Sequence, residues 1–240
     1  MTQFSLNLNK IALLRNSRGG LRPDLLEFAR MAINAGVRGL TVHPRSDARH
    51  ITFDDVRALS RLPQVVSKEV ELNIEGDLRP DLIRLVEVLQ PSQFTVVPVT
   101  PGEITSNRGW RDCDPHEQLS FVVRQLKGVR ISVFSDATPQ SCNYVINSGA
   151  QAIEIYTGPF AEAYLSGSYD KELSALVETS KQARSAALRI NLGHDLTLDN
   201  IAVIRKVMEV DEVSIGHQFI IDALYIGWIA AVDCYLRACE

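Results

Sequence analysis

Short apolar runs recur along the whole chain, and each is separated from the next by a longer segment with helix-like periodicity. Their length and their content of β-branched residues are typical of β-strands. The eight runs are residues 4–8, 39–42, 70–74, 93–97, 130–134, 152–156, 188–192 and 212–215. Because strand and helix alternate from end to end, the pattern predicts an α/β fold with a parallel sheet.

The number of repeats and the lack of a linker decide between two architectures. Eight strand–helix repeats without a Pro-, Gly- or Ser-rich linker favour a closed (β/α)₈ barrel. We therefore predict that residues 1–240 form a single TIM-barrel catalytic domain. The alternative is an open doubly wound sheet of the Rossmann type. That fold would place Gly-x-Gly-x-x-Gly after the first strand, where the chain has LNLNKIALLRN at residues 6–16.

Several predicted helices begin with a recognisable capping signal. Thr52 is followed three residues later by Asp55, and Thr197 precedes another apolar-periodic stretch. Thr138 stands directly before a proline, which is favoured at the first helical position. The clearest signal is DPHE at residues 114–117, where the aspartate is the expected N-cap and the glutamate the third helical residue.

Composition and charge bear on which partners the protein binds and on where in the cell it works. A formal net charge of -4 provides no electrostatic basis for binding nucleic acid or an anionic membrane. The four cysteines show neither paired metal spacing nor the density of a disulfide scaffold, which favours reduced thiols in a cytoplasmic protein. The N-terminus lacks the apolar core of a signal peptide. Residues 219–239 are apolar, but three charged residues interrupt them, so we expect no membrane span.

Histidines gather at the ends of the predicted strands. His43 and His50 follow the second strand, His194 the seventh and His217 the eighth, whereas His116 falls in the first turn of a helix. The carboxyl ends of barrel strands form one face, which is where barrel enzymes carry their active sites. A lone histidine at a strand end is usually a loop hydrogen-bonding residue, but four on one face favour a shared site.

Two glutamates lie within or at the end of predicted strands. Glu75 precedes a glycine at the end of the third strand, where desolvation would raise its pKa toward the range of a general base. Glu154 is flanked by isoleucines, a costly place for a charge without a partner. Pairing with an arginine remains the alternative for Glu75, and a structural salt bridge inside the barrel remains as plausible as catalysis for Glu154.

The same face carries two groups of residues suited to anions. Gly193 and Gly216 follow the seventh and eighth strands, the usual phosphate-binding half of this fold. Arg18, Arg45 and His50 would form a second anion site on the opposite half. Two anion sites indicate either two phosphorylated substrates or one bisphosphate. A metal site is not predicted, because no His-x-His or His-x-x-x-His pair occurs and arginines crowd the second strand's histidines.

Seven segments, taken together and in order, resemble the pyridoxine 5′-phosphate synthase family. They are LNLNKIALLRNSRG, VHPRSDARHI, NIEG, ITSNRGW, EIYTGPFA, NLGHDLT and DEVSIGH. The resemblance implies a transferase-type condensation in vitamin B6 biosynthesis. It joins 1-deoxy-D-xylulose 5-phosphate to 3-amino-2-oxopropyl phosphate and closes a pyridine ring, releasing phosphate and water. It also implies that no metal or organic cofactor is needed and that the chain forms a homo-oligomer, an octamer in the family.

The resemblance also assigns roles to four candidate catalytic residues. His43 and Glu75 would accept protons, His194 would donate one, and Glu154 would stabilise charge in the transition states. Such chemistry fits these residue types, because near-neutral histidines and a desolvated glutamate exchange protons near pH 7.

Further positions match substrate-binding residues of the family. Those implied for the deoxyxylulose phosphate are Arg45, His50 and Thr105, and those for the amino-ketone phosphate are Asn7, Arg18, Gly216 and His217, with a backbone contact at Asp195. In many members an Asp-His pair after the first strand contacts the sugar phosphate, and this chain has Asn9 and Lys10 at that place, which the resemblance implies as substrate-binding residues. Lysine keeps a positive charge there but does not titrate near pH 7, so contact could persist without a proton role.

Two rival functions share the predicted fold. A phosphosugar aldolase or isomerase would use the same phosphate-binding loops. A Schiff-base aldolase requires a lysine inside a strand, and no strand run has one apart from Lys10 at the first strand's end. A binding barrel without catalysis would be expected to lack Glu75 or His194, and both are present. The last predicted helix, Phe219 to Cys239, carries more apolar surface than one barrel-facing stripe needs, which favours a homo-oligomer.

Overall fold

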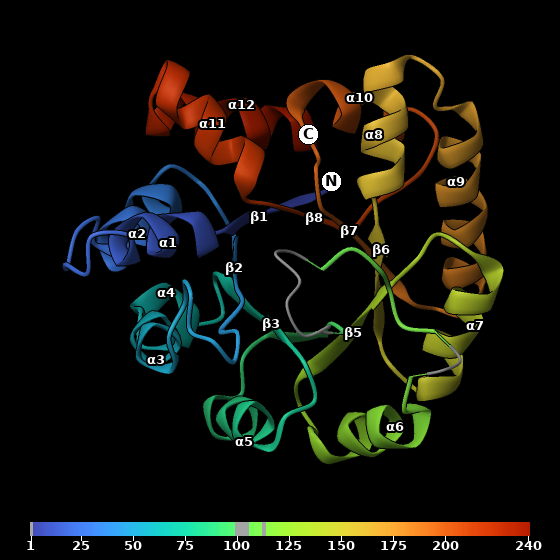
Figure 1. Cartoon of the computed structure of the whole chain (residues 1–240), viewed down its shortest axis with the longest axis horizontal. Coiled ribbons are helices and arrows are strands. Elements are labelled where there is room, and N and C mark those ends of the chain that lie inside the picture. Colours follow the sequence, from blue (N-terminus) through green and yellow to red (C-terminus); the bar gives the residue numbers. More distant parts are fainter. Residues whose placement is uncertain (1, 99–105, 112–113) are drawn as a thin grey trace.

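Eight parallel strands close into a barrel in the computed structural model, which describes residues 2–98, 106–111 and 114–240. The first strand pairs with both the second and the eighth, so the sheet has no open edge, and helices surround it (Figure 1). The strands are β1 (Gln3–Asn7), β2 (Gly39–Val42), β3 (Glu71–Gly76), β4 (Gln93–Val96), β5 (Arg130–Ser135), β6 (Ala152–Tyr156), β7 (Arg189–Gly193) and β8 (Glu212–Ile215). All eight predicted strands and the predicted TIM barrel are confirmed.

Helices follow the strands around the barrel. They are α1 (Asn9–Asn16), α2 (Leu25–Asn34), α3 (Phe53–Ser60), α4 (Pro63–Val66), α5 (Pro80–Leu89), α6 (His116–Gln125), α7 (Pro139–Ser148), α8 (Gly158–Ser166), α9 (Asp170–Ser185), α10 (Leu198–Arg205), α11 (His217–Ile226) and α12 (Trp228–Cys239). The two chain ends meet beside β1, where the backbone N–H of Thr2 donates to the carbonyl of Cys239 at 3.2 Å (Figure 1).

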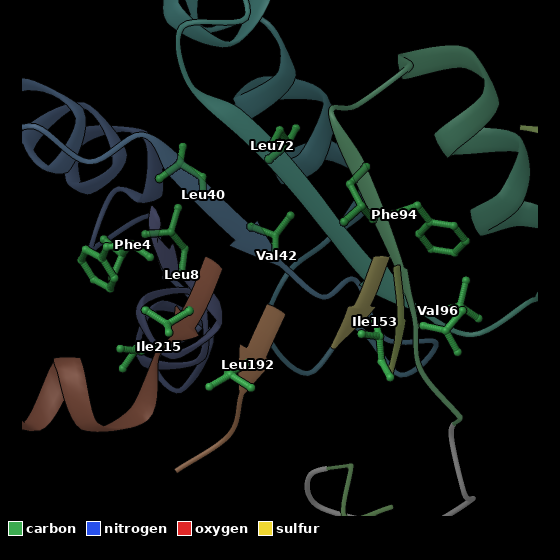
Figure 2. Close-up of a cluster of buried hydrophobic side chains, with 14 of the residues drawn as sticks. Phe4, Leu8, Leu40, Val42, Leu72, Phe94, Val96, Ile153, Leu192 and Ile215 are labelled. Atoms are coloured by element: carbon green, nitrogen blue, oxygen red, sulfur yellow. The ribbon is translucent and has the colours of Figure 1, made fainter. Parts of the chain in front are cut away.

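The apolar core lies between the strands and the surrounding helices. Successive strand residues point to opposite faces, so every second side chain turns away from the barrel axis. Phe4 of β1, for example, stacks on Tyr235 of α12 with ring centroids 5.4 Å apart. Figure 2 shows Leu40, Leu72 and Phe94 projecting from neighbouring strands in the same buried cluster. This burial is the main force that holds the helices against the barrel.

The barrel interior is polar, unlike the branched aliphatic layers typical of this fold. Ser5 and Thr41 share a hydrogen bond of 2.7 Å between neighbouring strands. Asn73 donates to Thr41 at 3.3 Å and accepts from the hydroxyl of Thr95 at 2.9 Å. These bonds satisfy buried polar groups that would otherwise destabilise the fold, and they fix the floor beneath the strands' carboxyl ends.

Three of the predicted helix caps are confirmed. The Thr52 hydroxyl accepts from the N–H of Asp55, and the Asp55 carboxylate accepts from the N–H of Thr52. A matching reciprocal pair links Thr197 with Asn200 at the start of α10. The Thr138 hydroxyl accepts from the N–H of Ser141, the third residue of α7, as its position before a proline indicated. Local sequence therefore determines where these helices begin.

The predicted cap at residues 114–117 is wrong. Helix α6 begins at His116, with Pro115 in the N-cap position and no side-chain cap. Asp114 instead accepts from Arg108 at 2.7 Å and from the N–H of Arg111 at 2.8 Å. The Asp114 carboxylate is engaged by two guanidinium nitrogens of Arg108 and by the N–H of Arg111, which gives it more bonds than a helix cap would.

The single helix predicted over residues 219–239 is also wrong. Gly227, with φ 89° and ψ 153°, breaks it into α11 and α12. The two helices pack together, and the Tyr235 hydroxyl donates to Asp222 at 2.7 Å. Glycine alone adopts this backbone conformation without strain, which explains the position of the break. Across the portion of the chain that the structure covers, no helix is both long and apolar enough to cross a membrane.

Candidate active site

A cavity of about 550 Å³ opens at the carboxyl ends of the strands. Its size falls within the range usual for small-molecule sites. Twelve of the residues predicted for the site line it: Asn7, Asn9, Lys10, His43, Arg45, His50, Glu75, Glu154, His194, Asp195, Gly216 and His217. Side chains from strands or loops far apart in the sequence thus meet in one space.

Three predicted residues are not among those lining the cavity. Gly193, expected in the phosphate-binding half, ends β7 with the Glu154 carboxyl against it. Arg18 lies in the exposed turn between α1 and α2. Thr105 lies outside the described residues. Their roles stay predictions.

The residues after β1 position the loop after β2. The side-chain oxygen of Asn7 accepts from the N–H of Asn9 at 3.0 Å, and the side-chain oxygen of Asn9 accepts from the N–H of His43 at 2.8 Å. Asn9 therefore holds the backbone from which the His43 imidazole projects. An aspartate at this position would offer the same acceptor oxygen, so this contact does not require the family's usual residue.

His43 and Glu75 lie side by side in the cavity. His43 Nδ1 lies 3.9 Å from Glu75 Oε2, and both side chains are buried. Burial lowers the pKa of His43 well below its usual value, with His50, Arg45 and Arg79 adding to the effect. Burial also raises the pKa of Glu75 to about 7, helped by the negative charge of Glu212. At neutral pH a neutral imidazole thus faces a carboxyl group near the midpoint of its titration.

Glu154 occupies space that a larger residue at position 193 would fill. A Cβ added to Gly193 would lie 2.2 Å from Glu154 Oε1, so only glycine lets the carboxyl reach this place. Burial raises the pKa of Glu154 well above its usual value, and Glu75 and Glu212 raise it further. Two buried carboxyls that repel each other favour protonation of at least one of them.

The two glutamates are not arginine-paired in the part of the chain that is described, where neither forms an ion pair with a guanidinium. The alternatives of an arginine-paired Glu75 and a salt-bridged Glu154 are therefore not found there. Glu75 accepts from the Asn7 amide at 3.5 Å, and both glutamates line the cavity.

Two imidazole nitrogens are buried in the site without a hydrogen-bond partner among residues 2–98, 106–111 and 114–240. They are His43 Nε2 and His194 Nδ1. A buried polar atom without a partner is costly, and such atoms mark places where a ligand supplies the missing bond. Burial lowers the pKa of His194, while the neighbouring Asp195 raises it.

One side of the cavity carries positive charge. Lys10, Arg45 and Arg49 line it together with His50. His50 Nδ1 accepts from the N–H of Ile51 at 2.9 Å, and burial and the nearby Arg45 lower its pKa to about 4. A neutral His50 with its acceptor nitrogen engaged presents an N–H from the other ring nitrogen, which suits an anionic oxygen.

The sequence pattern did not single out several lining residues. Tyr156, Ser106 and Ser214 also face the cavity. Tyr156 could have been found, because it follows Glu154 by two residues on the same strand and so shares its face. Within the described ranges, no group of three or more His, Cys, Asp or Glu side chains is arranged to hold a metal ion.

The chain is similar to known proteins over nearly its full length. Residues 4–240 match the family described as pyridoxal phosphate biosynthesis protein PdxJ. A pyridoxine 5'-phosphate synthase of Xanthomonas axonopodis pv. citri is 43% identical over 245 residues, which cover 98% of this chain and 95% of that protein. A pyridoxine 5'-phosphate synthase of Mesorhizobium japonicum is 42% identical over 241 residues, covering 99% and 98%.

Solved structures add a likeness of fold. Thiamine phosphate pyrophosphorylase from Pyrococcus furiosus superposes with a TM-score of 0.62 and 9% sequence identity, covering 100% of this chain and 95% of that chain. At so low an identity this likeness concerns the barrel alone.

Proposed function

Because this chain belongs to the family of the pyridoxal phosphate biosynthesis protein PdxJ, we propose that it is a pyridoxine 5′-phosphate synthase. In the proposed reaction, a transferase-type condensation joins 1-deoxy-D-xylulose 5-phosphate to 3-amino-2-oxopropyl phosphate. The pyridine ring closes, and phosphate and water leave. The observation that carries the proposal is the meeting of His43, Glu75, Glu154 and His194 in one cavity.

The reaction needs bases and acids in series, because C–H protons must leave and hydroxyl and phosphate groups must be eliminated. His43, held neutral by burial, is suited to accept a proton. Glu75 would accept a second substrate proton, because a carboxylate whose pKa is about 7 is basic enough to remove a proton from carbon. The 3.9 Å between His43 Nδ1 and Glu75 Oε2 supports a role for both acceptors toward one bound molecule.

We assign proton donation to His194, after β7, and charge stabilisation to Glu154, on β6. His194 gains a proton during the cycle and returns it to a leaving oxygen, helped by the negative charge of Asp195. Burial favours the neutral form of Glu154, so we expect its carboxyl to ionise when positive charge develops on the condensing nitrogen and to stabilise that charge.

Two phosphate groups are accommodated in separate parts of the site. Arg45 and His50, with Thr105, would hold the deoxyxylulose phosphate. Asn7, Gly216 and His217, with Arg18, would hold the amino-ketone phosphate. A Cβ on Gly216 would lie 3.0 Å from the Cβ of Asn7, so glycine keeps this second region open. Assembly into a homo-oligomer, an octamer as in the family, is part of the same proposal.

The direct test is to mix the purified protein with both phosphorylated substrates and to follow pyridoxine 5′-phosphate absorbance and released phosphate. We expect both products in equal amounts, and none from either substrate alone. Ring product from one substrate, or phosphate release without ring product, would contradict the proposal.

A Schiff-base aldolase is disfavoured as the second candidate. The eight strands contain no lysine, and Lys10 lies in the first turn of α1 rather than at the end of β1. Borohydride treatment in the presence of either ketone substrate should therefore leave the mass of the protein unchanged.

A further inference from the structure

The segment EIYTGPFA contains residues to which the proposed function gives no role. Glu154 belongs to the catalytic group, but Tyr156, Thr157 and Gly158 do not. They join the end of β6 to the start of α8. The segment lies beside the end of β7, because β6 and β7 pair in register from Ala152 and Arg189 to Tyr156 and Gly193.

The turn that carries His194 has an unusual backbone. His194 has φ 81° and Asp195 has φ 57°, so two consecutive residues with side chains adopt the left-handed conformation. Residues other than glycine enter this region at an energetic cost, and they stay there only when neighbouring groups hold them.

Thr157 supplies the groups that hold this turn. Its hydroxyl oxygen lies 2.6 Å from the carbonyl oxygen of Gly193 and 2.5 Å from that of His194. Its backbone N–H also donates to the Gly193 carbonyl, at 3.0 Å. The Asn200 side chain donates to the carbonyl of Asp195 at 3.1 Å. Each carbonyl of the strained turn is thus engaged, two of them by the buried Thr157.

The His194 ring is enclosed by two aromatic rings. Its centroid lies 4.7 Å from that of Phe134 and 5.4 Å from that of Tyr156, which stands edge-on at 88°. Gly158 makes room for this arrangement, because a Cβ there would lie 2.3 Å from Cζ of Tyr156. The two aromatic rings therefore restrict the orientation of the His194 imidazole, which also depends on the backbone conformation of the turn that carries it.

We infer that Thr157 is a positioning residue for His194, its hydroxyl fixing the left-handed turn so that the imidazole stays between Phe134 and Tyr156 and faces the cavity. This inference rests on the proposed function, in which His194 donates a proton. Thr157 itself does not line the cavity and is not expected to touch substrate.

The central variant is Thr157→Val, which keeps the volume and removes the hydroxyl. We expect kcat for ring formation to fall by about 10- to 100-fold, because a misplaced proton donor loses its alignment in the transition state. KM for each substrate should change by less than about twofold, because ground-state binding does not use the hydroxyl. Thr157→Ser, which keeps the hydroxyl, should restore kcat to within about threefold of the original protein.

Thr179 provides a matched control. It is equally buried, and its hydroxyl has no hydrogen-bond partner within the described part of the chain. Thr179→Val should leave kcat unchanged. If Thr157→Val does not fold, Thr157→Cys takes its place, because a thiol is a weaker donor. Its kcat should lie below that of Thr157→Ser, and a kcat equal to or above that of the serine variant overturns the inference.

A second measurement needs no substrate. Deuterium exchange at the imidazole C2 carbon, followed by mass spectrometry of peptides, reports the environment of each histidine separately. In Thr157→Val the His194 ring should exchange faster, while His116, in α6, serves as the internal reference. Unchanged His194 exchange together with unchanged kcat overturns the inference. If the original protein forms no ring product, the proposed function fails, and the exchange measurement still tests the positioning.

Discussion

At the scale of single residues, the buried carboxyl of Glu75 distinguishes an enzyme from a binding barrel. Glu75→Gln keeps the shape of the side chain but cannot accept a proton. We expect ring formation to fall by about 10² to 10⁴, while calorimetry shows that both substrates still bind. Near-normal turnover with a lowered melting temperature would instead remove Glu75 from the mechanism.

The same residue predicts a pH dependence of stability. Burial raises the pKa of Glu75 to about 7 from 4.5, so the fold prefers the protonated form. Its ionisation therefore costs stability progressively as the pH rises from 4.5 to 7, on the order of 3 kcal/mol when complete. Because Glu75→Gln removes this cost, its melting temperature relative to the original protein should rise over that interval.

The control for this measurement is Glu87→Gln on the exposed face of α5. Its melting temperature, compared with the original protein, should show no trend between the same pH values. A flat difference for Glu75→Gln as well would show that the Glu75 carboxyl is not desolvated in the fold.

At the scale of elements, β6 and β7 pack so closely that the Glu154 carboxyl lies directly against Gly193. Gly193→Ala places a Cβ about where the Glu154 carboxyl lies, at 2.2 Å from Oε1. We expect kcat to fall by at least about tenfold, because the carboxyl or the His194 turn must move. Gly20→Ala, with nothing within 4 Å of the added Cβ, is the control. Equal kcat for the two variants would show that the contact is relieved without consequence.

At the scale of the whole molecule, the apolar surface of α11 and α12 predicts self-association. Leu224 is 81% exposed and Tyr225 85%, and Ile226 and Ile229 are half exposed beside them. Contiguous apolar surface of this kind marks an interaction site. Light scattering at micromolar concentration should give a mass at least twice the 26.7 kDa of one chain.

Leu224→Lys should shift that equilibrium toward the monomer, because a charge on the contact face must be desolvated on association. Val88→Lys provides the comparison, since Val88 is 71% exposed on α5, away from this surface. A monomeric original protein, or equal effects of the two variants, would contradict assembly through α11 and α12.

The sequence by itself determined the eight strands, the closed barrel and most of the candidate site. Strand periodicity and helix caps such as Thr52 and Thr197 depend on neighbours a few residues away, so they can be predicted from the sequence without knowledge of the fold. The residues of the candidate site could be predicted because they follow strands, and the carboxyl ends of all strands in a parallel barrel lie on one face.

Only the tertiary structure decided what depends on contacts distant in sequence. Asp114 pairs with Arg108 and does not cap α6. The polar interior links strands through the hydrogen bond between Thr41 and Asn73. The backbone of Gly227 separates α11 from α12 and lets the two helices pack together. The rise in the pKa of Glu75 was predicted from its place at a strand end, but the repulsion among Glu75, Glu154 and Glu212 that adds to it arises only once the barrel has closed. The role of Thr157 was hidden for the same reason: its partners lie 36 and 37 residues further along the chain.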